Sequence, residues 1–231
     1  MNIRAICFDL DNTLWDVWPV IMRAEQAMYD FLAARYPKTV ANVTVEALRE
    51  ARSQVAHDHP QMAHDFTFLR KQALRNLAAE HNYPDVLVDE AFQVFIDARN
   101  DVALYDEVMP ALTTLSTRFR LFTASNGNAD LAKIGIAHLF ERNIAARQVG
   151  ALKPDPIVFH KVIEGTDLQA NEVLYVGDDP IMDVVGSRAA GMHPIWINRD
   201  GHAWPLDLEP ARFAITSLDE LVELTMHQPL T

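Results

Sequence analysis

The sequence changes its pattern twice, and these changes limit the folds that the chain can adopt. Residues 3–8 form a short apolar segment that ends at Asp9, which is typical of a buried strand. From about residue 17 to residue 99, apolar residues recur at helical spacing and prolines interrupt the pattern. The rest of the chain alternates between short apolar segments and amphipathic ones. Such an alternation predicts a parallel sheet that is covered by helices on both faces.

The expected elements follow from this pattern. Helices are predicted at residues 20–35, 45–55, 66–82 and 86–100, and then at 128–136, 155–164 and 180–190. Strands are predicted at residues 119–124, 143–146, 173–176 and, as the last one, 194–197. We therefore predict an α/β fold with a doubly wound parallel sheet, or Rossmann-like core, at residues 1–15 and 101–231. An inserted α-helical cap domain is predicted at residues 16–100.

Composition excludes several classes of protein. The 231 residues carry a formal net charge of −12, which argues against general binding of nucleic acids. Cys7 is the single cysteine, so the chain cannot form an internal disulfide. No segment approaches the roughly 20 apolar residues that span a membrane. We expect a soluble, cytoplasmic protein, monomeric or homodimeric, that binds neither membranes nor nucleic acid.

Two acids directly follow the first predicted strand. Side chains two residues apart in an extended segment point the same way, so Asp9 and Asp11 are expected to face one small volume. Two carboxylates that share a site repel each other unless a proton or cation intervenes. Mg2+ is the usual hard cation beside carboxylates and phosphate. The alternative is a solvated loop that contains two acids.

Polar residues also follow the second strand and precede the next helix. Ser125, Asn126 and the turn at Gly127 offer a hydroxyl, an amide and backbone N–H groups to an anion. The alternative is ordinary capping of a helix by Ser125 or Asn128. Further along, Lys153 could neutralise a transferring phosphoryl group, or it could be a surface lysine before a helix.

The last cluster follows the strand at residues 173–176. Gly177 permits a close backbone approach, Asp178 follows the strand, and Asp183 lies about one helical turn later. These acids are candidate metal ligands, or residues that orient such ligands. The alternative is that they stabilise a helix N-terminus, which suits Asp179 better than Asp178.

In four motifs, and in the position of the cap, the chain resembles the haloacid dehalogenase-like hydrolase superfamily. The motifs are Asp9-Leu10-Asp11-Asn12-Thr13, Ser125, Lys153, and Gly177-Asp178-Asp179 with Asp183. The resemblance implies that Asp9 is a nucleophile that forms an aspartyl-phosphate, and that Asp11 protonates the leaving oxygen and then activates water. It also implies that Mg2+ is held by the side chains of Asp9 and Asp178 and by the backbone carbonyl of Asp11.

The remaining motif residues receive supporting roles from the same resemblance. Ser125, the Asn126 amide and Lys153 would hold the phosphoryl oxygens, and Asp183 would act through water or orient Lys153. Haloacid dehalogenases lack the second acid of the first motif and need no metal, so Asp11 argues against that activity. The implied partner is a small-molecule phosphate ester. The alternatives are a phosphomutase, a phosphoglycolate-type phosphatase, and a catalytically silent regulatory protein.

Further stretches are similar to the bacterial flavin mononucleotide phosphatase-like branch, which also dephosphorylates a riboflavin-pathway intermediate. They lie at residues 19–25, 64–70, 125–129 and 191–197. A threonine is commoner than Ser125 in this branch, but serine keeps the hydroxyl. Within the predicted cap, His64 and Arg70 are candidates for contacting the substrate. Trp15 and Trp18 could stack on a planar substrate or pack in the interior.

Overall fold

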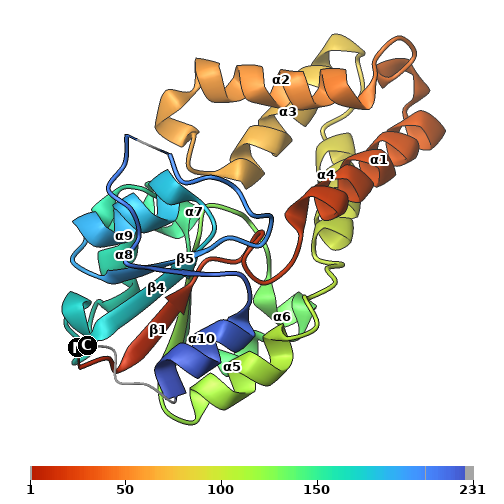
Figure 1. Ribbon diagram of the computed structural model, residues 1–231. Coiled ribbons are helices and arrows are strands. Elements are labelled where there is room, and N and C mark those ends of the chain that lie inside the picture. The colour runs from red at the N-terminus through yellow and green to blue at the C-terminus, as the bar shows by residue number, and fades with distance from the viewer. Residues whose placement is uncertain (1, 206, 227–231) are drawn as a thin grey trace. The chain divides into compact units, whose positions relative to one another are not determined.

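The computed structural model describes residues 2–205 and 207–226, and these contain a sheet of six parallel strands (Figure 1). The strands are β1 (Ala5–Phe8), β2 (Arg120–Ser125), β3 (Arg142–Ala145), β4 (Val173–Gly177), β5 (His193–Ile197) and β6 (Phe213–Ile215). Their order is β3-β2-β1-β4-β5-β6, so β1 lies between β2 and β4. The predicted α/β fold is confirmed, and the carboxyl ends of the strands meet at one edge.

The structure divides into two compact units. The core unit comprises Met1–Asp16, Ala103–Gly127 and Gly135–Thr231, and the helical unit comprises Val17–Val102 and Asn128–Ile134. The segment Asn128–Ile134 lies outside the range predicted for the cap. Among the described residues, no helix combines the length and the apolar character needed to cross a bilayer.

Helices flank the sheet of the core unit on both faces (Figure 1). They are α5 (Val108–Ser116), α7 (Ala146–Val149), α8 (Pro156–Ile163), α9 (Gly186–Ala189) and α10 (Leu218–Met226). The core unit also contains the short 3-10 helices η3 (Ala137–Leu139) and η4 (Ala170–Glu172) and the π-helix η5 (Pro180–Val185). Cys7 of β1 lies opposite Phe122 and Tyr175 of the neighbouring strands. It packs in an apolar cluster that includes Phe159 of α8. Cys7 is therefore a small core residue.

The helical unit contains the four long helices that the helical spacing predicted. They are α1 (Val17–Arg35), α2 (Val45–Asp58), α3 (Phe66–Glu80) and α4 (Val86–Arg99), joined by η1 (Pro37–Thr39) and η2 (Pro60–Met62) and accompanied by α6 (Leu131–Ile134). Side-chain caps fix two of the starts: Thr44 accepts a hydrogen bond from the N–H of Ala47, and Asp65 accepts one from Phe68. An apolar cluster around Leu32, Leu87 and Phe95 forms the interior of this unit.

Two expectations about the chain after residue 100 were wrong. The helix predicted at residues 128–136 is confined to α6, because the Asp130 carboxylate caps Ala132 and Gly135 adopts a φ of 92°. The strand predicted as the last is followed by β6 and α10. The β6 strand has three residues, which is too short for the period-2 alternation of a strand to be recognised.

Candidate active site

Asp9 follows directly on the central strand of the sheet. Its N–H donates to the carbonyl oxygen of Val176 at 2.8 Å, which extends the pairing of β1 with β4 by one residue. Asp9 is 5% exposed. An ionised carboxylate buried this deeply needs a partner of opposite charge, and Lys153 is that partner.

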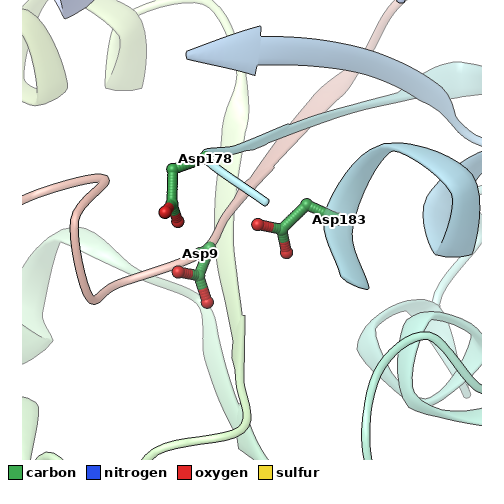
Figure 2. Close-up of side chains that lie close together, drawn as sticks. All are labelled: Asp9, Asp178 and Asp183. Carbon is green, nitrogen blue, oxygen red and sulfur yellow. The ribbon is translucent and has the colours of Figure 1, made fainter. Parts of the chain in front are cut away.

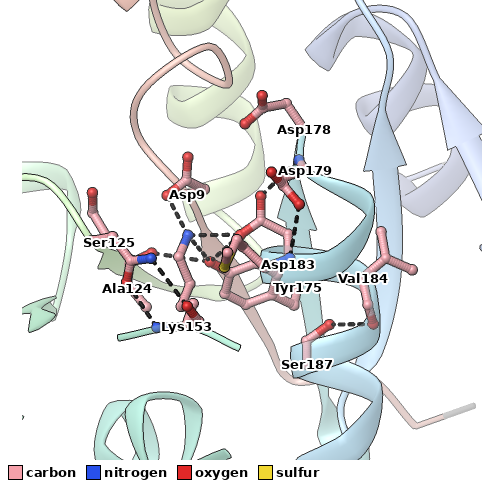
Figure 3. A network of polar contacts seen from close by, with 12 residues as sticks. Asp9, Ala124, Ser125, Lys153, Tyr175, Asp178, Asp179, Asp183, Val184 and Ser187 are labelled. Atoms are coloured by element: carbon pink, nitrogen blue, oxygen red, sulfur yellow. Dashed lines mark hydrogen bonds and ion pairs between the residues drawn. The ribbon is translucent and has the colours of Figure 1, made fainter. Parts of the chain in front are cut away.

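The Lys153 ammonium uses all three of its N–H donors inside the site. Nζ donates to Asp9 Oδ1 at 2.5 Å, to Asp183 Oδ1 at 2.6 Å and to the hydroxyl of Tyr175 at 3.0 Å (Figure 3). Burial lowers the pKa of Lys153, but the charges of Asp183 and Asp9 outweigh burial and raise that pKa above its ordinary value. Lys153 is therefore a buried and fully hydrogen-bonded cation, not the surface lysine of the alternative interpretation.

The side chain of Asn126 fixes the backbone from which Lys153 extends. Its Oδ1 accepts a hydrogen bond from the N–H of Lys153 at 2.8 Å, and its Nδ2 donates to the carbonyl oxygen of Lys153 at 3.2 Å. Ser125 is buried at the end of β2, and its Oγ accepts the N–H of Gly127 at 3.0 Å. The last residue of β2 thus places a hydroxyl beside the turn, and Asn126 of that turn holds the Lys153 backbone in place.

Tyr175 belongs to this network, although no sequence motif predicted a role for it. Its hydroxyl lies within hydrogen-bonding distance of the Ala124 carbonyl oxygen, at 3.0 Å, and of Asp183 Oδ1, at 3.1 Å. Burial raises the pKa of Tyr175 well above its ordinary value, so the hydroxyl stays protonated. A tyrosine within a predicted buried strand was the available signal, because its hydroxyl must find a polar partner.

Three carboxylates converge at the ends of β1 and β4. Asp9, Asp178 and Asp183 each offer one oxygen, and these oxygens lie within 4.8 Å of one another (Figure 2). Asp183 lies in η5 and is 1% exposed, and its Oδ2 accepts the N–H of Asp179 at 3.0 Å. Burial, followed by the charge of Asp183, raises the pKa of Asp178 to about 7.

The donor set of this cluster fits a hard divalent cation. With all groups ionised, the three carboxylates and the Lys153 ammonium carry three negative charges against one positive charge. The two remaining negative charges match one divalent cation, and carboxylate oxygens are the ligands that Mg2+ prefers. Asp183 is thus one of three acids that could hold such a cation, and it also bonds to Lys153.

Gly177 makes the close approach of Asp183 possible. A Cβ atom at residue 177 would overlap the Asp183 carboxyl group, which Lys153 and the Asp179 N–H hold in place. We expect Gly177→Ala to lower the free energy of unfolding by more than about 3 kcal/mol, because the overlap cannot relax freely. Gly150→Ala is the control, since that glycine has a φ of 80° but open space around it. Equal losses for both variants in urea unfolding would contradict this expectation.

A tight loop follows Asp9 and carries Asp11. The N–H of Asn12 donates to the Trp15 carbonyl oxygen at 2.7 Å, and the indole N–H of Trp15 donates to Asp11 Oδ1 at 2.9 Å. Trp15 is fully buried, so it packs in the interior and offers no stacking surface. The loop orients the Asp11 carboxylate through a side chain that cannot itself move freely.

Arg199, far along the chain from this loop, binds it through a backbone carbonyl. Its Nη2 donates to the Thr13 carbonyl oxygen at 2.8 Å, and its Nη1 lies 2.7 Å from Glu107 Oε1. The guanidinium also lies over the ring of Tyr105, 3.8 Å from the centroid. The sequence held no signal for Arg199, because these contacts depend on how a loop after β5 packs against segments far away in the chain.

Comparisons with known proteins identify the family of the chain. The profile of the haloacid dehalogenase-like hydrolase family matches residues 3–191. The chain is 29% identical over 200 residues to 5-amino-6-(5-phospho-D-ribitylamino)uracil phosphatase YigB of Escherichia coli (strain K12). The aligned region covers 85% of this chain and 84% of that protein.

Two solved structures share nearly the full length of the chain. A 2-haloacid dehalogenase from Pseudomonas syringae pv. Tomato DC3000 is 37% identical with a TM-score of 0.90, over 96% of this chain and 97% of the other. A phosphatase of the same superfamily from Thermococcus onnurineus is 25% identical with a TM-score of 0.69, over 96% and 97%. With its family profile matched over most of the sequence and its strand-end residues assembled in one place, this chain belongs to the haloacid dehalogenase-like hydrolase family.

Proposed function

We propose that this protein is a Mg2+-dependent phosphatase that hydrolyses a small-molecule phosphate monoester through an aspartyl-phosphate on Asp9. The observation that carries the proposal is the position of Asp9. Its carboxylate is buried against the Lys153 ammonium on one side and lies within 4.8 Å of the carboxylate oxygens of Asp178 and Asp183. A carboxylate that lies between an ammonium group and carboxylates able to bind a metal is suited to attack on phosphorus.

In the first step, an Asp9 oxygen forms a bond to phosphorus and the bond from phosphorus to the ester oxygen breaks. Asp11 donates a proton to the departing oxygen, so the alcohol leaves as a neutral molecule. The bound divalent cation would be held by Asp9, Asp178 and the Asp11 carbonyl and would offset charge on the phosphoryl oxygens.

In the second step, water attacks the phosphorus of the aspartyl-phosphate. Asp11, now ionised, takes a proton from that water, and the bond from phosphorus to Asp9 breaks. Inorganic phosphate leaves and both carboxyl groups return to their starting states.

Ser125 and the backbone amide of Asn126 would bind the phosphoryl oxygens. Lys153 acts through its charge, because all its donors are engaged by Asp9, Asp183 and Tyr175.

The substrate that we propose is flavin mononucleotide or a related phosphate of the riboflavin pathway. The Escherichia coli relative supports this choice, since its name gives a ribitylamino-uracil phosphate as its substrate. A phosphoglycolate-type or sugar phosphatase and a phosphomutase share the same strand-end chemistry and are the alternatives. A mutase would return the phosphoryl group to an isomerised sugar, whereas a phosphatase releases it to water.

Dehalogenation is the competing hydrolytic activity, because the structure from Pseudomonas syringae is named a 2-haloacid dehalogenase. A halide leaves without a proton and its displacement calls for neither a second acid nor a metal. The presence of Asp11 and of the carboxylate cluster at Asp178 and Asp183 favours phosphate esters.

One experiment compares both activities in the same preparation. Purified protein is incubated with flavin mononucleotide, nucleotides, sugar phosphates, phosphoglycolate and an aryl phosphate, with Mg2+ or with a chelator. Phosphate release is measured beside halide release from 2-chloropropionate. We expect Mg2+-dependent phosphate release and no halide. Halide release without turnover of any phosphate ester would overturn the proposal, and absence of both activities would favour a silent regulatory protein.

Arg199→Gln tests whether the clamped loop positions Asp11. The variant loses the contacts to Thr13 and Glu107, so the proton donor becomes less well placed. We expect kcat/KM to fall about tenfold for an alkyl phosphate but less than about threefold for p-nitrophenyl phosphate, whose leaving group needs little protonation. Arg188→Gln is the control, because Arg188 also binds two backbone carbonyls, those of Glu209 and Pro210. Equal losses for both esters would mean that Arg199 does not act through Asp11.

A further inference from the structure

The helical unit contains a cavity that the proposed reaction does not use. It has a volume of about 110 Å3 and lies between α1, α2 and α3. Its apolar walls include Met28, Leu48, Leu74 and Leu77, and two arginines, Arg52 and Arg70, also line it. Arginine is an unusual wall for a small apolar cavity, because a guanidinium without an acceptor is costly to remove from water.

The charges around this cavity are unequal. Glu25 of α1 is 2% exposed, and three guanidinium groups from α2 and α3 surround it. Arg49 binds Glu25 Oε2 through Nη2 at 2.6 Å and through Nε at 2.8 Å. Arg70 reaches Glu25 Oε1 at 3.3 Å. One buried carboxylate therefore forms ion pairs with two arginines, and its interaction with the third, Arg52, is electrostatic without a hydrogen bond.

Arg70 is held in a defined position with donors to spare. The residue is 4% exposed, and its guanidinium lies 3.5 Å from the ring centroid of Phe95, so one face of the group is stacked. Burial, together with the nearby charge of Arg52, lowers the pKa of Arg70 to about 10. Its long contact with Glu25 engages a single nitrogen, whereas a guanidinium has five N–H donors. This geometry is pre-formed and does not require Arg70 to move.

Arg52 faces the same cavity without a carboxylate of its own. In the part of the chain that the structure describes, no acceptor lies within hydrogen-bonding distance of its guanidinium. Its nearest ring is Phe66, at 6.0 Å. Arg52 is partly buried, and burial lowers its pKa although the charge of Glu25 acts in the opposite direction.

Two further acids lie near the cavity without balancing it. Glu46 is in the first turn of α2 and acts on Arg49, which Glu25 already neutralises. Glu80 lies at the rim of the cavity and is exposed, so water screens its charge. In a purely structural ion-pair network, each guanidinium would be bound to its own carboxylate. Here Arg49 and Arg70 share Glu25, and Arg52 binds no carboxylate among the described residues.

We propose that this cavity, which we call the arginine cavity, binds a small carboxylate that has a short apolar body. The carboxylate would lie between Arg52 and Arg70, which offer the forked donors that suit two oxygens. The apolar body would contact Met28, Leu48 and Leu74. A volume of about 110 Å3 lies between the share of one water, roughly 30 Å3, and a cavity of about 150 Å3 that holds benzene. A ligand of about six non-hydrogen atoms therefore fits.

Butanoate is a suitable probe, and butanamide is its uncharged counterpart of nearly the same shape. The methyl group of Met28 reports on the cavity, because Met28 lines it and is 3% exposed. Full-length protein labelled with 13C at the methionine methyl groups is titrated with each probe. The Met28 signal is assigned from its loss in Met28→Leu. We expect butanoate to shift this signal saturably at millimolar concentrations, and butanamide at the same concentrations to leave it nearly unchanged.

Variants separate the charge from the shape of the cavity. Arg52→Gln is expected to weaken butanoate binding at least about tenfold, because a charge-assisted hydrogen bond is lost. Arg52→Lys keeps a cation and is expected to weaken it less. Arg75→Gln, which changes an exposed arginine of α3, is expected to bind like the wild type. Thermal unfolding confirms that each variant is folded.

Three results would overturn the proposal. The first is an equal response of the Met28 signal to butanoate and butanamide, which would mean that the cavity is merely apolar. The second is no response to either probe. The third is unchanged binding in folded Arg52→Gln. Asp9→Asn is the control for binding of butanoate at the strand-end site instead of the arginine cavity. If butanoate binds in the arginine cavity, this variant gives the same Met28 response as the wild type.

Discussion

Replacing Asp9 by asparagine is expected to lower the rate of phosphate release by at least about 10³-fold and to leave the protein folded. An amide cannot form the covalent intermediate, and it also removes one of the carboxylates that face Asp178 and Asp183. The fold should survive, because Lys153 keeps its bonds to Asp183 and Tyr175. Phosphate release is measured from the best ester of the substrate panel, and unfolding is followed in urea.

A matched Asp→Asn control and a chemical trap complete this test. Asp155→Asn changes the cap of α8, where Asp155 accepts the N–H of Ile157 at 3.0 Å, and asparagine caps a helix equally well. Its activity should equal that of the wild type. Acid quenching during turnover of a 32P-labelled ester should leave label on the wild-type peptide that contains Asp9 and none on Asp9→Asn. Turnover of Asp9→Asn within tenfold of the wild type would exclude Asp9 as the nucleophile.

Lys153→Met is expected to remove both activity and stability. The ammonium lies 2.5 Å from Asp9 and 2.6 Å from Asp183, and all three residues are buried. Its loss leaves two buried carboxylates facing each other without a cation, which costs about 3–5 kcal/mol in the free energy of unfolding. Phosphate release should fall by at least about 10³-fold, because charge on the transferring group is no longer offset.

The double variant Lys153→Met/Asp183→Asn distinguishes the two effects. The amide introduced at position 183 is neutral, so the repulsion with Asp9 disappears and part of the stability should return. Activity should not return, since the double variant still lacks the cation beside Asp9. Recovery of turnover together with stability would mean that Lys153 serves the fold alone.

Much of the candidate site could be predicted because parallel strands bring their carboxyl ends to one edge. Asp9, Ser125 and Asp178 each lie at such an end, so their proximity followed from the order of strands and helices. The role of Tyr175 could not be predicted in the same way. Its hydroxyl reaches Lys153 and Asp183 only because β4 adjoins β1 and the Lys153 side chain contacts residues of both segments. Such contacts depend on how the side chains pack in the folded protein, and the spacing of residues along the sequence does not reveal them.

The parts that the sequence did not predict are short or distant. The strand β6 has three residues, and α6 has four, because Asp130 and Gly135 limit it. Arg70 was predicted to contact the substrate from the cap, but the structure buries it between Glu25 and Phe95. A charged residue in a helical pattern is usually exposed, and only the positions of Glu25 and Phe95 on other helices reveal the exception.

The bridge between Trp15 and Leu104 has a consequence for how such a protein can change. This pair, together with the bond from the Tyr105 N–H to the Leu14 carbonyl oxygen at 3.1 Å, joins the two ends of the inserted helical segment within the core unit. The core unit thus closes this long loop with its own contacts, and the entropy of closure grows only slowly with the length of what is inserted. We therefore expect the insertion to be a replaceable module, whose helices can be lengthened, exchanged or shortened while the strand ends that hold Asp9 keep their geometry.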